Sequence, residues 1–293
     1  MKFIFEPFKQ NNMIIADIFG GMGNQMFQYA TAYKLALMMN TELVLNTSAL
    51  KKDIKRSYAL KPFWINNQII EFDIHDASTL KKYIYGVPNR ISRYKEPAEF
   101  VYDTGLSLLK GDYHISGYWQ NPAYFNDIRE VISSIFSLRS PSSEFIKMQK
   151  AVREMPSLSL HVRRGDFVEN SYISKIHDVC DIHYYVDAIN TFRQMFGSDH
   201  YNLFVFSDDP GWCQQQFAQY SNVHIVRSLT DAEEMLLMSE CHHNITANST
   251  FSWWGAWLNK NPDKIVITPE VWLKNTNLQY QLILPEGWVK IKH

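Results

Sequence analysis

The residues best suited to chemistry are two adjacent arginines, Arg163 and Arg164, which follow the alternating apolar run 158–162. This alternation predicts a short strand, so both arginines emerge where the strand ends. A guanidinium offers a planar fork of donors that matches phosphate oxygens. The pair therefore predicts a pyrophosphate clamp. The alternative is two surface arginines that form ion pairs with Asp166 and Glu169.

Two further predicted strands in the second half of the chain end in polar residues. These residues are Ser207, Asp208 and Asp209 after the run 203–206, and Asn248, Ser249 and Thr250 after the run 243–247. Alternating strands and helices predict a parallel sheet with helices on both faces, which brings all three strand ends to one edge. Ligands bind at such edges in open α/β sheets. The three ends together therefore predict a nucleotide pocket.

Each polar group in this pocket has an expected partner on a nucleotide. The hydroxyls of Ser249 and Thr250, with free N–H groups at the start of the next helix, suit phosphate oxygens. The carboxylate of Asp208 or Glu234 suits guanine N–H groups or ribose hydroxyls. One of Asp208 and Asp209 is also a candidate N-cap for the helix that follows.

A glycine-rich turn in the first half also has the form of a nucleotide-binding element. Gly20-Gly21-Met22-Gly23 separates a predicted strand over 14–19 from a predicted helix, and glycines let the backbone approach a ligand closely. The glycine spacing matches neither GxGxxG nor the P-loop, and Asn46 stands where NAD binding requires an acidic residue. The sequence therefore argues against NAD. Residues 50–110 predict only short helices and loops.

Composition and charge exclude several classes of protein. The 293 residues carry 29 Lys+Arg against 30 Asp+Glu, and this near-neutral balance argues against nucleic-acid binding. Three widely spaced cysteines without a CxxC pair favour a reducing, cytoplasmic location. Asp208-Asp209 lacks further oxygen ligands at useful spacing, and His242-His243 point apart, so no metal is expected. No apolar run reaches the ~18 residues of a transmembrane segment.

Four stretches of the chain carry a recognisable pattern. They are Gly20-Gly21-Met22-Gly23-Asn24-Gln25-Met26-Phe27-Gln28-Tyr29, His161-Val162-Arg163-Arg164-Gly165-Asp166-Phe167, Phe206-Ser207-Asp208-Asp209, and Met235 through Trp257, centred on Ala247-Asn248-Ser249-Thr250-Phe251-Ser252-Trp253-Trp254. In this order and spacing they resemble the α-1,2-fucosyltransferases, glycosyltransferase family 11. The resemblance spans residues 13 to about 273.

The resemblance implies an α/β fold of two facing Rossmann-like domains, the GT-B-type glycosyltransferase fold. It implies that the C-terminal domain holds GDP-fucose and that L-fucose moves to the 2-hydroxyl of a terminal galactose on a glycan. Inversion at the anomeric carbon, without a metal or other cofactor, is part of this expectation. We assign residues 1–150 to an N-terminal, acceptor-side domain, with 1–12 as an appendage, and residues 151–293 to the donor domain. The Ser/Pro-rich stretch 140–143 has the composition of a linker, and the boundary is expected near residues 140–155.

The resemblance also implies roles for residues within these stretches. Arg163 would hold the donor pyrophosphate, and His161 and Arg164 would shape the same loop. Asn24 would approach the fucose and the phosphate from the N-terminal domain. The complete set of expected donor-binding residues is Gly21, Gly23, Asn24, His161, Arg163, Arg164, Ser207, Asp208, Glu234, Asn248, Ser249, Thr250 and Phe251.

The acceptor hydroxyl must lose a proton, and the chain offers several carboxylates that could accept it. Asp166 is the predicted base and, with Arg163 and Asn24, completes the expected catalytic set; Asp17 and Glu169 are weaker candidates. The alternative for Asp166 is a structural role in the arginine loop. A fully dissociative route needs no strong base.

Acceptor contacts are expected from residues 50–125, with Tyr118, Trp119 and Gln120 as candidates. Two other functions stay open at this point. One is a fucosyltransferase that makes another linkage, and the other is a non-catalytic protein that binds nucleotide sugars or glycans. The intact set of Asn24, Arg163 and Asp166 favours an enzyme. We expect a cytoplasmic protein, with peripheral attachment at the inner face of the membrane as the alternative.

Overall fold

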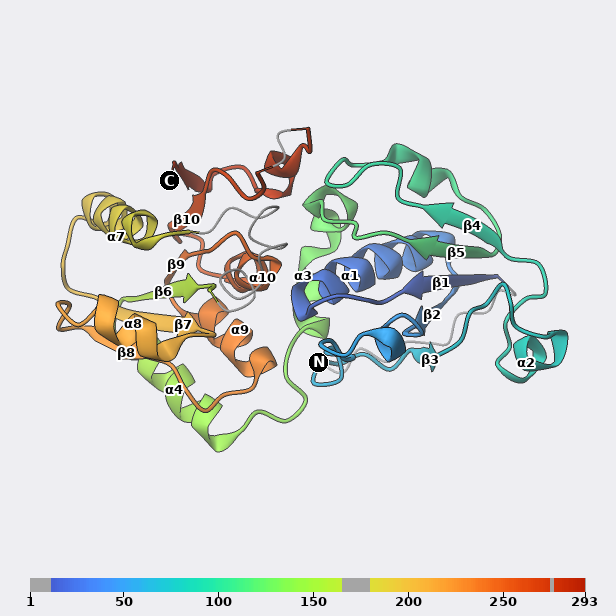
Figure 1. Cartoon of the computed structure of the whole chain (residues 1–293), viewed down its shortest axis with the longest axis horizontal. Coiled ribbons are helices and arrows are strands. Elements are labelled where there is room, and N and C mark those ends of the chain that lie inside the picture. Colours follow the sequence, from blue (N-terminus) through green and yellow to red (C-terminus); the bar gives the residue numbers. More distant parts are fainter. Residues whose placement is uncertain (1–11, 165–179, 275–276, 293) are drawn as a thin grey trace. The chain divides into compact units, whose positions relative to one another are not determined.

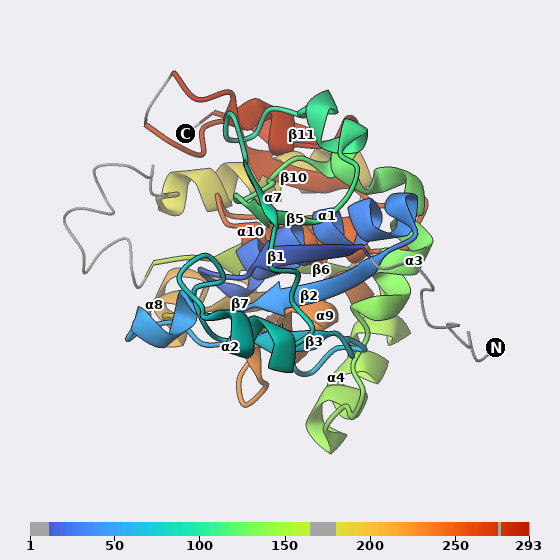
Figure 2. The same cartoon turned by 90° about the vertical axis from the view of Figure 1, so that its right-hand side faces the viewer.

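The computed structural model describes residues 12–164, 180–274 and 277–292 (Figures 1 and 2). The chain forms two compact units, Met1–Phe136 and Ser137–His293. The two units therefore divide just before the expected boundary region, residues 140–155. The reason is helix α4 (Ser143–Glu154), which packs against α9 (Asp231–Glu240) of the second unit. Its N-cap, Ser142, donates its backbone N–H to Glu233 Oε1 at 2.8 Å.

The first unit is built on a five-stranded, fully parallel sheet with the strand order β3-β2-β1-β5-β4. Its strands are β1 (Met13–Asp17), β2 (Glu42–Asn46), β3 (Gln68–Ile70), β4 (Ser92–Lys95) and β5 (Tyr113–Ser116). The long helix α1 (Met22–Met39) connects β1 to β2 and packs on both strands (Figure 1). Strands β3 and β4 were not expected from the sequence, because they are short and carry mostly exposed residues.

The two faces of this sheet are covered differently. Ile15 and Val44 pair across β1 and β2 and share an apolar cluster with buried residues of the segment 70–87. Because side chains alternate along a strand, Ile14 and Leu43 point to the opposite face, along which α1 runs. The face turned away from α1 ends in Asp17 at the carboxyl end of β1.

The second unit contains a six-stranded, fully parallel sheet with the strand order β11-β10-β9-β6-β7-β8. Its strands are β6 (Ser157–Val162), β7 (Asn202–Ser207), β8 (Val223–Ile225), β9 (His243–Ile245), β10 (Val266–Pro269) and β11 (Val289–Ile291). The further helices of this unit are α7 (Ile182–Phe196), α8 (Pro210–Gln216) and α10 (Thr250–Leu258).

Helices cover both faces of this second sheet, as the alternation of strands and helices predicted. Leu158 and Leu160 of β6 belong to a core that includes buried residues of α7 and α8. On the other face, α10 packs against α9 and β9. Gly255 allows this contact, because a Cβ there would lie 2.9 Å from Met238 Cβ. The tryptophans of α10 are buried and mutually packed, which confirms the expected core role of Trp253, Trp254 and Trp257.

The remaining elements are short. They are η1 (Leu50–Lys52), α2 (Thr79–Ile84), η2 (Thr104–Leu108), η3 (Pro122–Tyr124), η4 (Asn126–Ile128), α3 (Arg129–Ile135) and η5 (Tyr280–Ile283). Within the described ranges, none of the helices has both the length and the apolar character needed to cross a membrane.

Candidate active site

The register of two strands brings Arg163 next to Asp208. In the β6–β7 pair Val162 lies opposite Ser207, so the residues that follow also lie side by side. Arg163 Nη1 is 3.0 Å from Asp208 Oδ2, and the Arg164 backbone N–H donates to Asp208 Oδ1 at 2.9 Å. Asp208 therefore holds the start of the arginine loop through both of its carboxylate oxygens.

Arg164 is held by the same strand end. Its Nε lies 3.4 Å from Asp209 Oδ2, and its guanidinium lies over the Trp212 ring at 4.1 Å from the centroid. Asp209 is also the N-cap of α8 and accepts from the Trp212 backbone N–H at 3.0 Å. The prediction that one of the two aspartates caps this helix is thus confirmed. The ion pairs expected under the alternative, with Asp166 and Glu169, lie outside the described residues.

His161 lies beneath this loop as a buried, neutral ring. Burial, and then the nearby charge of Arg163, lower the pKa of His161 to about 3. Its Nδ1 is buried and has no hydrogen-bond partner among the described residues. The ring packs at 5.4 Å from that of Phe251, which belongs to the first turn of α10. His161 thus connects the end of β6 to the start of α10.

The third polar strand end lies on the other side of β6, because β9 neighbours β6 in the sheet. Buried Asn248 donates from Nδ2 to the Trp272 carbonyl at 3.2 Å. Ser249 is the N-cap of α10 and accepts from the Phe251 backbone N–H at 3.3 Å. Thr250 begins the helix, whose N-terminal N–H groups favour an anion. The predicted meeting of the three polar strand ends at one sheet edge is confirmed.

Glu234 lies near enough to the same edge for the charge of Asp208 to affect its pKa. This half-buried residue is in the first turn of α9. Burial, followed by the charges of Asp231 and Asp208, raises the pKa of Glu234 to about 7. Its ionised form can accept N–H groups of a base such as guanine. Ser207, at the end of β7, uses its Oγ to accept from the Asp209 backbone N–H at 2.9 Å.

The glycine turn of the first unit is held by two buried glutamines of α1. Gly20 has φ +75°, a left-handed conformation suited to glycine. Gln25 donates from Nε2 to the carbonyls of Gly20 and Ser57, each at 2.8 Å. Gln28 Oε1 accepts from the Phe19 backbone N–H at 2.9 Å. Sequence reasoning gave these glutamines no role, although amides among the apolar residues of this helix were a signal.

The same turn positions Asn24 and the two glycines expected at the donor. Gly21 is the N-cap of α1, and Gly23 is buried in its first turn. Asn24 Oδ1 accepts from Gln120 Nε2 at 2.8 Å, which joins two predicted site residues within one unit.

Of the three predicted acceptor contacts, one is contradicted by its burial. The Trp119 side chain is 1% exposed and stacks on Tyr94, so its ring supports the loop from inside. Gln120 is also buried, at 9% exposed, and is engaged by Asn24. Tyr118 is half-buried, and its backbone N–H donates to Glu96 Oε2 at 2.6 Å.

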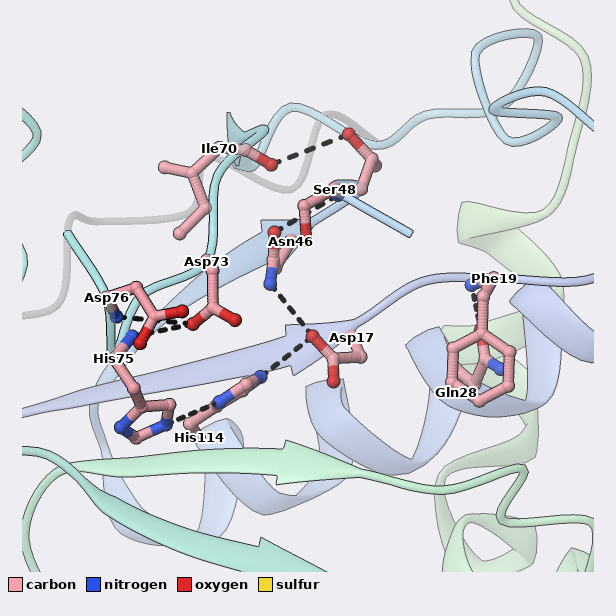
Figure 3. Close-up of polar contacts among 11 residues, drawn as sticks. Asp17, Phe19, Gln28, Asn46, Ser48, Ile70, Asp73, His75, Asp76 and His114 are labelled. Atoms are coloured by element: carbon pink, nitrogen blue, oxygen red, sulfur yellow. Dashed lines mark hydrogen bonds and ion pairs between the residues drawn. The ribbon is translucent and has the colours of Figure 1, made fainter. Parts of the chain in front are cut away.

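A polar cluster that sequence reasoning did not assemble lies at the carboxyl end of the first sheet (Figure 3). Asp17 Oδ1 lies 2.7 Å from His114 Nε2 and accepts from Asn46 Nδ2 at 2.9 Å. His114 Nδ1 lies 3.0 Å from His75 Nε2. Only Asp17 had been predicted, as a weaker candidate base. His75 and His114 gave no local signal, because the cluster joins segments far apart in the sequence.

Two expectations, the base Asp166 and the absence of a metal, are not tested by the described residues. Asp166, the predicted base, lies outside the described residues. In the parts of the chain that the structure describes, no three or more His, Cys, Asp or Glu side chains gather in a way that could hold a metal ion.

Known proteins are similar to this sequence over nearly its whole length. The family model described as Glycosyl transferase family 11 matches residues 6–292. An alpha-1,2-colitosyltransferase of Escherichia coli is 31% identical over 292 residues, which cover 96% of this chain and 99% of that protein. The O-antigen biosynthesis glycosyltransferase WbnK of Escherichia coli is 32% identical over 302 residues, covering 93% and 98%. The galactoside 2-alpha-L-fucosyltransferase SEC1 of Bos taurus is 27% identical over 251 residues, covering 82% and 62%.

A solved structure shows the same fold. A mutant of Arabidopsis thaliana FUT1 in complex with GDP has a TM-score of 0.50 at 11% identity, covering 87% of this chain and 70% of that one. With the two parallel sheets, this likeness confirms the predicted α/β fold of two Rossmann-like domains of the GT-B type. The family match and the bacterial relatives show that the chain belongs to glycosyltransferase family 11.

Proposed function

We propose that this glycosyltransferase moves L-fucose from GDP-fucose to the 2-hydroxyl of a terminal galactose on a glycan, with inversion at the anomeric carbon. The observation that carries the proposal is the meeting of Arg163, Asp208 and the start of α10 at adjacent strand ends of one sheet. A guanidinium and a helix N-terminus together favour a diphosphate. The relatives supply the sugar and the linkage as a hypothesis.

The chemistry needs fixed positive charge at this edge. When GDP departs, negative charge builds on the β-phosphate while the sugar becomes cationic. Donors that are already oriented stabilise that charge without reorganising. Asp208 orients the Arg163 guanidinium and the Arg164 backbone in advance. Because these groups supply the charge, the proposal includes no metal ion and no other cofactor.

The other donor contacts follow from the positions of the side chains. We assign guanine or ribose recognition to Glu234, whose pKa near 7 leaves it largely ionised in mildly alkaline solution. Ser249 and Thr250, at the start of α10, are assigned to phosphate oxygens. Asn24 is assigned to the fucose and the phosphate, and Asp166 stays a prediction for the base.

A second donor has a specific observation in its favour, namely the similarity to an alpha-1,2-colitosyltransferase over 96% of this chain. Colitose is L-fucose without its 3-hydroxyl. A site that hydrogen-bonds a hydroxyl rejects an analogue lacking it far more strongly than an apolar site rejects an added hydroxyl. The ratio of kcat/KM for GDP-fucose and GDP-colitose therefore identifies the donor.

The test of the proposal is GDP release from GDP-fucose with a panel of β-galactosides in the presence of EDTA, with product linkage determined by NMR. Release that an acceptor stimulates and EDTA leaves unchanged, giving an α-1,2 product, would support every part of it. Another linkage would point to a different fucosyltransferase. GDP binding without turnover across both donors would favour a non-catalytic nucleotide-sugar-binding protein. Absence of GDP binding would overturn the assignment of Arg163.

A further inference from the structure

The carboxyl edge of the first sheet carries a pocket of about 400 Å³, formed by residues of the first unit alone. This volume lies within the range of small-molecule sites. Its lining comes from the ends of four neighbouring strands and a connecting loop, and includes Asp17, Asn46, His75, Arg93, His114 and Ser116. The pocket lies on the face of the sheet that α1 leaves uncovered.

The lining side chains form a chain of hydrogen bonds that ends on one carboxylate oxygen. Figure 3 shows His114 and Asn46 both directed at the same oxygen of Asp17, with His75 next to His114 on the side away from Asp17. Both of these hydrogen bonds end on Oδ1, and no described residue donates to Asp17 Oδ2. Asp17 is thus anchored through Oδ1, and its second oxygen remains for a ligand in the pocket.

The direction of the donors in this chain follows from what each group can do. A carboxylate only accepts, so His114 donates from Nε2 to Asp17. With one proton on its ring, His114 then accepts at Nδ1 from the Nε2–H of His75. Burial, Arg93 and His114 lower the pKa of His75, which favours a neutral ring there. Both imidazoles therefore direct an N–H toward Asp17, and they orient the carboxylate rather than carry its proton away.

The rest of the lining matches a sugar. Ser116 and Asn46 offer hydroxyl and amide groups, and Arg93 is a cationic donor on the edge strand β4. Sugars present several hydroxyls that both donate and accept, so a pocket with carboxylate, amide and guanidinium groups can fix their orientation. Every residue of the lining carries a polar or charged group, and Tyr94 adds a ring on which an apolar sugar face can pack, so the lining favours a sugar over a lipid.

We propose that this pocket receives the terminal galactose of the acceptor and that Asp17 is the general base for its attacking hydroxyl, with His114 as the residue that positions Asp17. The proposal rests on the glycosyl transfer proposed above and names the acceptor subsite of that reaction. It makes Asp17 the alternative to Asp166 in the role of base.

The hydroxyl oxygen of the acceptor forms a bond to the anomeric carbon of the donor sugar, and the bond from that carbon to the phosphate oxygen breaks. The electron pair of the broken bond leaves with GDP. The hydroxyl proton moves to Asp17 Oδ2 and passes to water after the product departs.

The decisive variant is Asp17→Asn, because an amide oxygen can still accept from His114 and Asn46 while the basic oxygen is lost. A general base contributes typically ~10²–10⁴-fold to the rate, so kcat for transfer should fall by about that factor. The KM for the donor and the slow hydrolysis of the donor by water should stay at wild-type values. Asp112→Asn is the matched control, since Asp112 precedes β5 at the other end of the sheet and accepts the Met13 backbone N–H there at 2.7 Å. It should retain the wild-type kcat.

His114 is tested by rescue. His114→Leu removes the donor to Asp17 and should lower kcat, whereas His114→Gln restores an N–H and should recover part of the loss. A purely structural role for His114 would show equal losses in both variants and matching losses of thermal stability. Wild-type kcat in Asp17→Asn would overturn the base assignment, and a loss found in Asp166→Asn instead would move it to Asp166.

The pocket is also tested without turnover. Addition of methyl β-galactoside to the protein with bound GDP should shift the imidazole NMR signals of His75 and His114, and Asp17→Asn should weaken these shifts. If the wild type transfers no sugar but the shifts occur, the proposed transfer fails and the galactose subsite stands. If the wild type transfers fucose but the signals do not move, the subsite is overturned and the transfer stands.

Discussion

The carboxyl edges of the two sheets place charged groups in contrasting ways. On the second sheet, Arg163 and Arg164 pair with Asp208 and Asp209, two consecutive residues of the neighbouring strand end. On the first sheet, Asp17 is held by His114 and Asn46, which come from separate strands. The second sheet thus gathers cations and a helix N-terminus, which suit a diphosphate. The first sheet presents the Asp17 carboxylate in a polar pocket, which suits a hydroxyl.

This contrast teaches how each site tolerates change. In the second sheet, the register of β6 and β7 places Asp208 against both arginines. The loss of this one carboxylate therefore disturbs both Arg163 and Arg164. In the first sheet the carboxylate has two independent donors, so the loss of one leaves the other.

Arg163→Ala should cost the most activity on the second sheet. It removes a charge and a donor fork from the proposed phosphate clamp, and the loss of one such donor typically lowers kcat by ~10²–10³. Arg163→Lys should recover little, because an ammonium cannot make the bidentate contact. Steady-state kinetics with GDP-fucose measure both variants.

The control for Arg163 is Arg153→Ala in α4, which removes an exposed arginine that pairs with Glu240 in the same unit. Surface pairs contribute about 0–1 kcal/mol, so this variant should keep its activity and nearly all of its stability. Near-normal kcat in Arg163→Ala would remove the basis for the phosphate clamp.

Asp208→Asn should have the next largest effect, although we do not place Asp208 at the reacting atoms. The amide keeps an acceptor for the Arg164 backbone but loses the charge that holds Arg163. Hydrogen bonds to charged groups contribute about 1.5–3 kcal/mol, so kcat should fall by roughly 10–100-fold. Asp209→Asn is the matched comparison, because asparagine caps helices as well as aspartate does and α8 should remain intact. Equal losses in the two variants would contradict the special role of Asp208.

Glu234→Gln tests the pH dependence of the second edge. Burial and neighbouring carboxylates raise the pKa of Glu234 from 4.5 in the unfolded chain to about 7, so the folded state binds the proton more tightly. This residue therefore lowers stability progressively as the pH rises from about 4.5 to 7, and the penalty is constant above that range. Glu234→Gln should raise the Tm at pH 8 and leave it unchanged at pH 4.

The same variant should weaken GDP binding at pH 8, if Glu234 accepts guanine N–H groups. Thermal melts and calorimetric titrations from pH 4 to 8 measure both effects. Glu154→Gln, at an exposed position of α4, is the control and should shift neither curve. A gain in stability without loss of GDP affinity would leave the pKa explanation intact and remove Glu234 from the nucleotide site.

Sequence reasoning recovered the second edge because its residues are contiguous within motifs. Arg163 and Arg164 follow one strand, Asp208 and Asp209 follow the next, and alternation of strands and helices implied the parallel order. What the sequence did not indicate was the register. The pairing of Val162 with Ser207 decides which carboxylate each arginine meets, and no local pattern encodes it.

The first edge escaped sequence reasoning for a different reason. His75 comes from an irregular segment, and β4 is too short and too polar to be recognised as a strand. For Trp119, sequence reasoning overestimated the exposure of the side chain. An aromatic residue in a polar loop looked like a sugar contact, yet its ring is buried against Tyr94. Burial depends on how distant segments pack, which residue type alone does not determine.

The smallest effects are expected for alanine substitutions in the glycine turn, where Gly20 and Gly21 have different roles in folding and in binding. Gly20 has φ +75°, and its added Cβ would lie 3.1 Å from Asn24 Nδ2, so Gly20→Ala should lose about 1–2 kcal/mol of unfolding free energy. Gly21 has φ −73°, and its added Cβ would meet only the Arg56 guanidinium, at 3.8 Å from Nη1. Gly21→Ala should therefore fold with nearly wild-type stability.

Denaturant unfolding and donor kinetics, measured on both glycine variants, distinguish the two roles. If the backbone at Gly21 approaches the donor, Gly21→Ala should raise the KM for GDP-fucose while the Tm stays constant. Because Gly20→Ala also displaces Asn24, its kinetic loss should accompany its loss of stability. Unchanged KM in Gly21→Ala would remove this glycine from the donor site and leave Asn24, held by Gln120, as the contact that the turn provides.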